Sequence, residues 1–209
     1  MVRAVFALLV TAALAACAPR ASAPPPAVTT LPTNPGYLAC QQGLNGSGAM
    51  FEALTPMATR EGCGFTEGVK ITAVPSPLNQ PVVISCPTAL ALVRFDLDVL
   101  QPAAMQHFGK RVAKIHHVGG YACRGIAGTR KWSQHAYANA IDIMGFDLSD
   151  GTRILISRDW RAKGARASFL HDVARGACQV FRVVLTPAYD RAHHDHFHLD
   201  TGPDRLCGI

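Results

Sequence analysis

Two short polar segments constrain the fold of this chain more than any other feature. SQHAYANAID, residues 133–142, contains one histidine and one aspartate, and RAHHDHFHLD, residues 191–200, contains four histidines and two aspartates. Both are rich in side chains that bind metal ions. If they hold one ion, the fold must bring together two segments that are far apart in the sequence. If they do not, they are two unrelated solvated patches.

Strand geometry is compatible with a shared site. In HFHLD, residues two apart lie on one face of an extended strand, so His196 and His198 project together. In the other segment, Asp142 stands between Ile141 and Ile143 and faces away from the core when both isoleucines are buried.

His135 lies just before that strand, on a turn that can bring its ring to the same point. Two imidazoles and one carboxylate, with a fourth position left to water, are the ligand set of a catalytic zinc site. Such a site activates water for attack on a carbonyl group, and a nearby carboxylate can take the proton. A histidine-rich cluster on a solvated surface is the alternative.

The N-terminal residues are typical of an export signal. Residues 1–17, MVRAVFALLVTAALAAC, have one arginine, an apolar run and small residues, and the run is short for a membrane span. Its end at Cys17 resembles a bacterial lipoprotein signal, in which the cysteine is lipidated and anchors the protein to the membrane. The alternative is an ordinary signal peptide that ends near a cysteine. Either way we expect an exported protein, and the lipoprotein signal predicts a membrane-anchored periplasmic one.

Composition divides the rest of the chain. Residues 18–36 are rich in Pro, Ala and Thr without apolar periodicity, which predicts a disordered tether. Residues 37–209 suffice for one domain with a real core, and we expect a monomer. The net charge of +6 fits an ordinary basic surface or attraction to an anionic polymer such as cell-wall material. No Lys/Arg run is interleaved with aromatics, so we expect no nucleic acid.

Six cysteines follow Cys17, and an even number in an exported protein predicts disulfides. A cysteine zinc site is the rival, but no two of the six form a C-x-x-C pair. The sequence does not choose among the possible pairings of the candidates Cys40, Cys63, Cys86, Cys123, Cys178 and Cys207.

Apolar periodicity predicts an α+β domain with an antiparallel central sheet flanked by helices. Helical spacing covers 88–109, where Pro102 either begins a second helical turn or kinks the helix, and 166–181. The Asp150-Gly151 turn predicts a hairpin. The expected strands are 68–74, 81–85, a strand within 110–124, one from residue 140, 150–156, 182–186 and 196–200.

The paired segments resemble known families. SQHAYANAID with HDHFHLD is similar to the zinc D-alanyl-D-alanine carboxypeptidases and endopeptidases, which share a fold with lysostaphin-type peptidases and the hedgehog signalling domain. Together with YACR, the DG hairpin and FLHDVARGACQVF, the segments most resemble the bacterial extensin-like C-terminal domain family, over residues 40–200. This resemblance implies Zn²⁺ held by His135, Asp142 and His198.

The resemblance also implies catalytic roles. The base of the related carboxypeptidases lies three residues before the last ligand, which is Asp195 here, although those enzymes usually have glutamate. His196 matches the first histidine of a His-x-His form in related endopeptidases and is slightly favoured as the base. Arg124 matches an arginine that holds an anionic substrate group or the oxyanion, and a structural ion pair is its alternative.

Other residues receive lesser roles. Ser133 is expected to cap the turn, and Ala138 stands where the family usually has glycine, so it would be strained at positive φ. One of His193 and His194 is a candidate to support the site. The remaining histidines are expected to be solvated: His107, His116, His117 and His171.

Three functional hypotheses follow. The first is a zinc peptidase or amidase that acts on peptidoglycan stems or cross-links. The second is a non-catalytic wall-binding or structural domain that keeps a zinc site, since the hedgehog-type fold does not require peptidase activity. The third is a disulfide-stabilised binding domain without metal.

Overall fold

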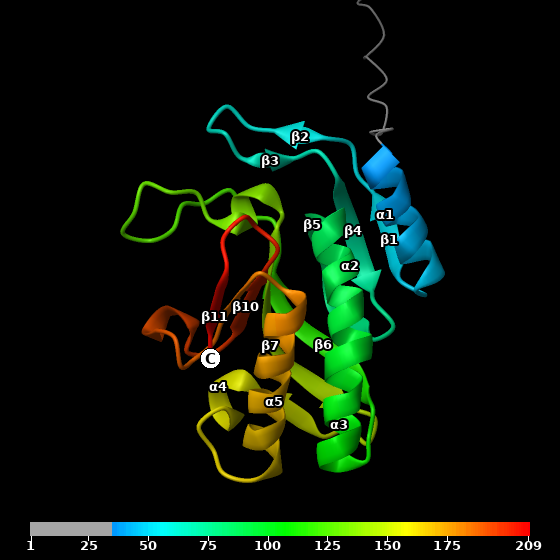
Figure 1. Ribbon diagram of the computed structural model, residues 1–209, viewed down its shortest axis with the longest axis vertical. Helices are drawn as coiled ribbons and strands as arrows, with labels where there is room; N and C mark the ends of the chain where they lie inside the picture. Colours follow the sequence, from blue (N-terminus) through cyan, green and yellow to red (C-terminus); the bar gives the residue numbers. More distant parts are fainter. Residues whose placement is uncertain (1–34) are drawn as a thin grey trace, which may run out of the picture.

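The computed structural model describes residues 35–209 and confirms the expected α+β class, with a large, mostly antiparallel sheet (Figure 1). Its strand order is β1-β4-β5-β6-β7-β10-β9-β11, with β8 also paired to β7. The β5–β6 and β9–β11 pairs are parallel, and the other pairs in the described residues are antiparallel. The strands are β1 (Met50–Ala53), β4 (Gly68–Ala73), β5 (Pro77–Ser85), β6 (Val112–Gly119), β7 (Ala140–Leu148), β8 (Arg153–Leu155), β9 (Val183–Leu185), β10 (Phe197–Asp200) and β11 (Leu206–Gly208).

A short separate hairpin, β2 (Met57–Ala58) and β3 (Gly64–Phe65), projects beyond this sheet (Figure 1). Helical elements pack on the sheet and link its strands. They are α1 (Pro35–Gly46), α2 (Cys86–Arg94), the π-helical η1 (Phe95–Leu100), α3 (Gln101–Phe108), η2 (Gln134–Tyr137), α4 (Ile156–Asp159), α5 (Ala165–Val180) and η3 (Arg191–His193).

The predicted helix at 88–109 forms one long rod of α2, η1 and α3 (Figure 1). Phe95 and Gln101, at its two internal junctions, both have right-handed helical backbone angles. The Gln101 amide donates to the Asp96 carbonyl, which is the wider π-type bond. This turn comes just before Pro102, which lacks an N–H and would disrupt an ordinary helical turn. The helix therefore continues through the proline.

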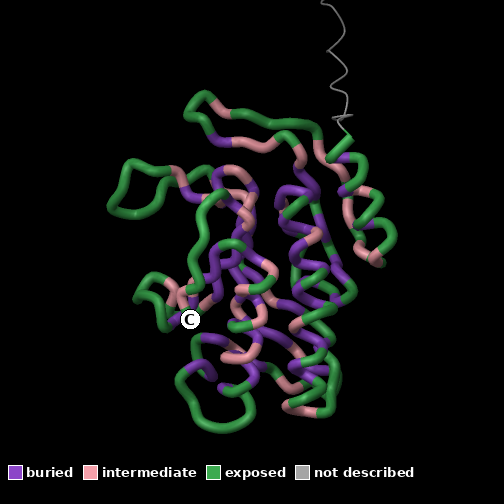
Figure 2. The backbone as a smooth tube through the Cα atoms, in the orientation of Figure 1, coloured by how far each residue is buried: buried purple, intermediate pink, exposed green. Residues whose placement is uncertain are grey.

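The core lies mainly between these helices and one face of the sheet, where Figure 2 shows most of the buried backbone. Ile141 and Ile143 of β7 pair with Leu199 and Phe197 of β10, and all four are fully buried. Because side chains alternate along a strand, Asp142 is forced to the opposite face. The alternation of apolar and polar residues in the sequence therefore places the Asp142 side chain on the face of the sheet that carries the candidate metal site.

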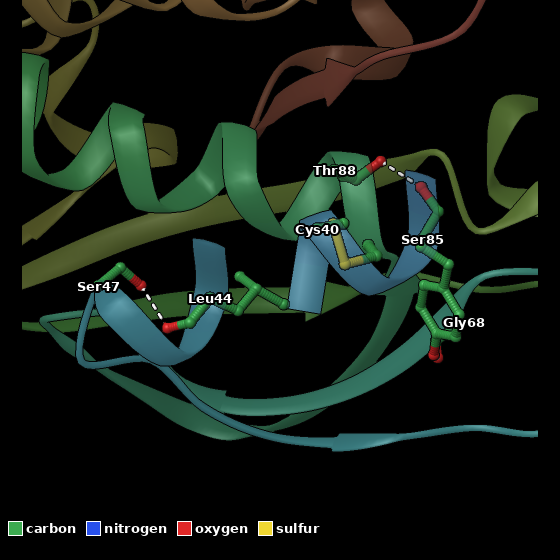
Figure 3. The surroundings of a disulfide bond; sticks show 8 residues. Cys40, Leu44, Ser47, Gly68, Ser85 and Thr88 are labelled. Carbon is green, nitrogen blue, oxygen red and sulfur yellow. Dashed lines mark hydrogen bonds between the residues drawn. A yellow bond between two sulfur atoms is a disulfide. The ribbon is translucent and has the colours of Figure 1, made fainter. Parts of the chain in front are cut away.

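The expected disulfides are confirmed, with the pairings Cys40–Cys86, Cys63–Cys123 and Cys178–Cys207. The first ties α1 to the start of α2, beside the Ser85–Thr88 hydrogen bond that lies at the beginning of that helix (Figure 3). Three disulfides indicate an exported, oxidising environment. In the described part of the chain, no helix has the length and apolar character needed to cross a membrane.

The predicted signal segment 1–17, its lipidation site Cys17 and most of the predicted tether lie outside the described residues. Helix α1 begins at Pro35, so the last two residues of the expected tether, 35–36, belong to a helix.

Candidate metal centre

Three elements carry the candidate ligands to one point. Strand register places His198 of β10 directly opposite Asp142 of β7. His135 lies on η2, whose start is capped because the Ser133 hydroxyl accepts from the His135 amide, as expected. Ala138 ends η2 with φ 59 and ψ 16, and it is the only non-glycine residue with positive φ among residues 35–209. This left-handed turn sends the chain straight into β7.

The ligand atoms form a nearly equilateral triangle. His135 Nε2 lies 3.1 Å from Asp142 Oδ1 and 3.1 Å from His198 Nδ1, and His198 Nδ1 lies 3.1 Å from Asp142 Oδ1. Tetrahedral zinc with bonds of about 2.0–2.1 Å needs ligand atoms roughly 3.3 Å apart. The three residues are buried, and within the described chain they are the only group of this kind that could hold a metal ion.

In both candidate histidine ligands, the ring nitrogen outside the triangle is hydrogen-bonded to an oxygen of the chain. His135 Nδ1 donates to the Gly120 carbonyl at 2.6 Å, and His198 Nε2 donates to Asp200 Oδ2 at 3.0 Å. In the neutral rings, His135 Nε2 and His198 Nδ1 therefore carry lone pairs. With both rings neutral, those lone pairs face each other and a carboxylate oxygen, so the triangle contains three acceptors, and a donor is present only when a ring is protonated. A cation at its centre would resolve this conflict, and the outer hydrogen bonds are those typical of metal-binding histidines.

The pKa values of His198 and Asp142 also indicate that this group favours positive charge. Burial alone would lower the pKa of His198, but hydrogen bonds with Asp142 and Asp200 outweigh it and raise that pKa to about 9. Burial alone would raise the pKa of Asp142, yet His135 and His198 hold it well below its usual range. A proton on His198 can therefore supply the positive charge that a metal ion would bring to this group.

The residues expected to be catalytic lie around this triangle. His196 Nε2 is 3.7 Å from Asp142 Oδ1, and His196 Nδ1 donates to Asp195 Oδ1 at 2.8 Å. Asp195 therefore contacts His196 and forms no ion pair with the three candidate ligands. Arg124 reaches in from the solvent side, with Nη2 3.7 Å from Asp142 Oδ2 and its side chain 54% exposed.

Sequence reasoning missed two contributors, Asp200 and the Gly120 carbonyl. Asp200 is buried and orients His198, and its signal was its position two residues along the same strand face. The Gly120 carbonyl gave no signal, because any residue has one. Of the two histidines considered as support for the site, His193 is in ring contact with His196 and His198 and donates to Asp190, whereas His194 is 65% exposed.

The other histidines were expected to be solvated rather than metal-ligating. None of them belongs to the candidate metal group, but the expectation that they are solvated is wrong. His117 is buried and donates to the Gln80 carbonyl, and His107 and His116 contact Asp172 and Asp147. His171 stacks on Trp160. Each packs between elements, where a ring nitrogen finds a partner from the chain itself.

Fold and site together define an α+β domain with a His–Asp–His group that could bind a metal ion. The chain matches the family described as Extensin-like protein C-terminus over residues 38–208, and it belongs to this family. Searches of the curated proteins and of the solved structures found no significant match.

Proposed function

We propose that this protein is a zinc-dependent hydrolase, a peptidase or amidase that acts on the peptide stems or cross-links of peptidoglycan. The observation that carries the proposal is the triangle of ligand atoms from His135, Asp142 and His198, which lie 3.1 Å apart and are all acceptors when the rings are neutral. The resemblance of these segments to the zinc D-alanyl-D-alanine peptidases supports it and supplies the substrate class.

The donor set favours zinc over the common hard cations. Two imidazole nitrogens and one carboxylate oxygen suit Zn²⁺, whereas Ca²⁺ and Mg²⁺ prefer sites made mostly of oxygen. Bound there, zinc would supply a Lewis acid that polarises a carbonyl group and lowers the pKa of water. Three protein ligands, rather than four, are typical of catalytic zinc sites and favour hydrolysis over a purely structural role.

His196 is the proposed general base. Its Nδ1 donates to Asp195, so in the neutral ring Nε2 carries a lone pair, and that nitrogen is directed toward Asp142. It is therefore placed to take a proton from the attacking water at Nε2. Asp195 orients the ring through the 2.8 Å bond and is proposed as a positioning residue.

Arg124 is proposed to bind the anionic group of the substrate or the oxyanion. Its guanidinium is more than half exposed and still lies 3.7 Å from Asp142. A solvent-facing cation beside a buried metal group can meet an incoming carboxylate without leaving its own partner.

The remaining parts of the proposal concern location. We propose export through segment 1–17, anchoring through lipidated Cys17 and action in the periplasm. The three disulfides support export, and mass spectrometry of the N-terminal peptide would test the lipid.

Metal analysis followed by peptidoglycan digestion tests the function. We expect about one zinc per purified chain and soluble muropeptide release that His198→Ala abolishes together with the zinc. His194→Ala is the matched control, because His194 belongs to the same segment but is 65% exposed. Zinc without release would favour a wall-binding or structural zinc domain, and absence of zinc would refute the proposal.

A further inference from the structure

Two projecting segments beside the metal centre carry a concentrated positive charge. We call them the basic arms, defined as residues 57–65, which include β2 and β3, and residues 123–132. Figure 1 shows both extending from the same side of the molecule, and Figure 2 shows that they are largely exposed. The Cys63–Cys123 disulfide joins them.

The basic arms contain four basic residues and one acidic residue, Glu61. Their net charge of +3 is half of the +6 of the chain, although they comprise only 19 of its 209 residues. The four basic side chains are exposed: Arg60, Arg124, Arg130 and Lys131. Between residues 35 and 209, only Arg124 among the four forms an ion pair, with Asp142. The other three charges are therefore not neutralised by the domain itself.

The arm at 123–132 has a defined shape. Gly125 and Trp132 form a β-bridge, and the Ile126 amide donates to the Lys131 carbonyl at 2.9 Å. Thr129 fixes the tip, because its hydroxyl donates to the Ile126 carbonyl and accepts from the Lys131 amide. Arg130 and Lys131 are thus presented by an ordered tip.

Both ends of this arm are attached to the metal centre. The Ala122 amide donates to the carbonyl of His135, and the Ser133 amide donates to the carbonyl of Arg124. A polymer held at Arg130 and Lys131 would therefore be bound by an arm whose base is fixed to η2, the element that carries His135. Exposed cations next to a site also attract an anionic partner over about a Debye length, roughly 8–10 Å at moderate salt.

We infer that the basic arms are a docking surface for the carboxylate groups of peptidoglycan, through Arg60, Arg130 and Lys131. Arg124, at the base of one arm, belongs instead to the proposed reaction site. This inference rests on the proposed function for the identity of the polymer. It adds that Arg60, Arg130 and Lys131 hold the polymer by charge and take no part in cleavage.

Co-sedimentation of the full chain in detergent with insoluble peptidoglycan tests the inference. EDTA is present, so that cleavage does not remove the polymer. We expect the double variant Arg130→Gln/Lys131→Gln to bind about fivefold more weakly at about 50 mM NaCl, and to match the unmodified protein at about 500 mM. Peptidoglycan with amidated carboxylates should bind the unmodified protein as weakly as native polymer binds the variant.

The matched control is Lys110→Gln/Arg111→Gln. It removes the same two charges from an adjacent exposed pair between α3 and β6, away from the arms. It should bind within about twofold of the unmodified protein if location matters more than net charge. An equal loss in the control, unchanged binding in the arm variant or full binding to amidated polymer would each overturn the inference.

Parallel measurement of muropeptide release with zinc, without EDTA, keeps the two proposals distinguishable. Charge-dependent sedimentation without any release would leave the docking surface standing and refute the hydrolase. Muropeptide release by a protein whose sedimentation does not depend on the arm charges would support the hydrolase and refute the docking surface. Circular dichroism of each variant confirms that it is folded.

Discussion

Strand β7 carries an aspartate near each end, and the two meet histidines in different ways. At the far end, Asp147 accepts two bonds from Arg153, at 2.7 and 3.0 Å, and contacts His116 at 2.8 Å. At the near end, Asp142 faces His135 and His198, whose facing nitrogens carry lone pairs in the neutral rings. The chain supplies a permanent cation in close contact with Asp147, whereas Arg124 stays 3.7 Å from Asp142.

This difference separates a structural ion pair from a binding site. The charge of Asp147 is compensated by Arg153 once the chain has folded, so this cluster needs no bound ligand. The Asp142 group is buried and has no permanent cation in close contact, so its charge is compensated only by a protonated histidine or by a bound cation. Perturbed carboxylates are common in both kinds of cluster, and what distinguishes these two is whether the chain supplies a permanent compensating charge.

The largest expected effect is the difference in zinc affinity between a variant that lacks Asp142 and one that lacks Asp147. We expect Asp142→Ala to weaken zinc binding more than about 100-fold, because it removes a direct ligand. Asp147→Ala should leave zinc affinity unchanged, because its partners are internal. Competition with a fluorescent zinc chelator measures both. Equal affinities in the two variants would show that the comparison of the two ends is mistaken.

Removal of the support behind His198 should have an intermediate effect. Asp200→Ala takes away the acceptor of His198 Nε2, so the ring no longer has a fixed tautomer. We expect zinc affinity to fall about 10- to 100-fold, as for other partners of metal-binding histidines. Asp190→Ala is the control, because Asp190 holds His193 rather than a ligand. The chelator assay decides, and a similar loss in both variants would contradict the assignment.

The ion pair between Asp147 and Arg153 should make the stability of the fold sensitive to acid. Hydrogen bonds from Arg153, together with His116, lower the pKa of Asp147 to about 2 despite the opposing effect of partial burial. A lowered pKa stabilises the fold above the ordinary value of about 4, and this stabilisation is lost as pH falls from about 4 to 2. After allowance for solvent screening we expect about 1 kcal/mol. Urea unfolding of Asp147→Asn across this range should show a shallower acid loss than the unmodified protein.

The turns that flank β7 should give the smallest effects. Gly151, after its far end, has φ 84 with open space around it, so Gly151→Ala should cost about 1 kcal/mol from backbone strain alone. Ala138, before its near end, already bears this strain at φ 59. Ala138→Gly relieves it but removes a buried methyl group, so a net change within about 0.5 kcal/mol is expected. Thermal unfolding would check both, and a large loss in Ala138→Gly would show that the methyl group matters more than the strain.

Much of this could be predicted from local patterns. Ile141 and Ile143 aim Asp142 by strand alternation, and Pro102 marked a special point in a helical run. The triad itself came from the resemblance together with that alternation. Asp200 had the same face signal as His198 and was overlooked.

Other features depend on distances that no local pattern contains. The pairing of Cys63 with Cys123 arises because a projecting hairpin reaches the segment before η2. His116 and His117 looked solvated because their partners, Asp147 and the Gln80 carbonyl, come from other elements. The π-helical turn at Phe95–Leu100 accommodates Pro102, and the sequence did not predict which form this turn would take.

The bond between Cys40 and Cys86 also has a mechanical consequence. Helix α1 is the first described element, and this covalent link fastens it to the first residue of the long helical rod. Tension applied to the chain before Pro35 would unwind at most the residues of α1 before Cys40, and would then pass through the disulfide into that rod. The disulfide therefore limits how far a pull on the N-terminal end can unravel the domain.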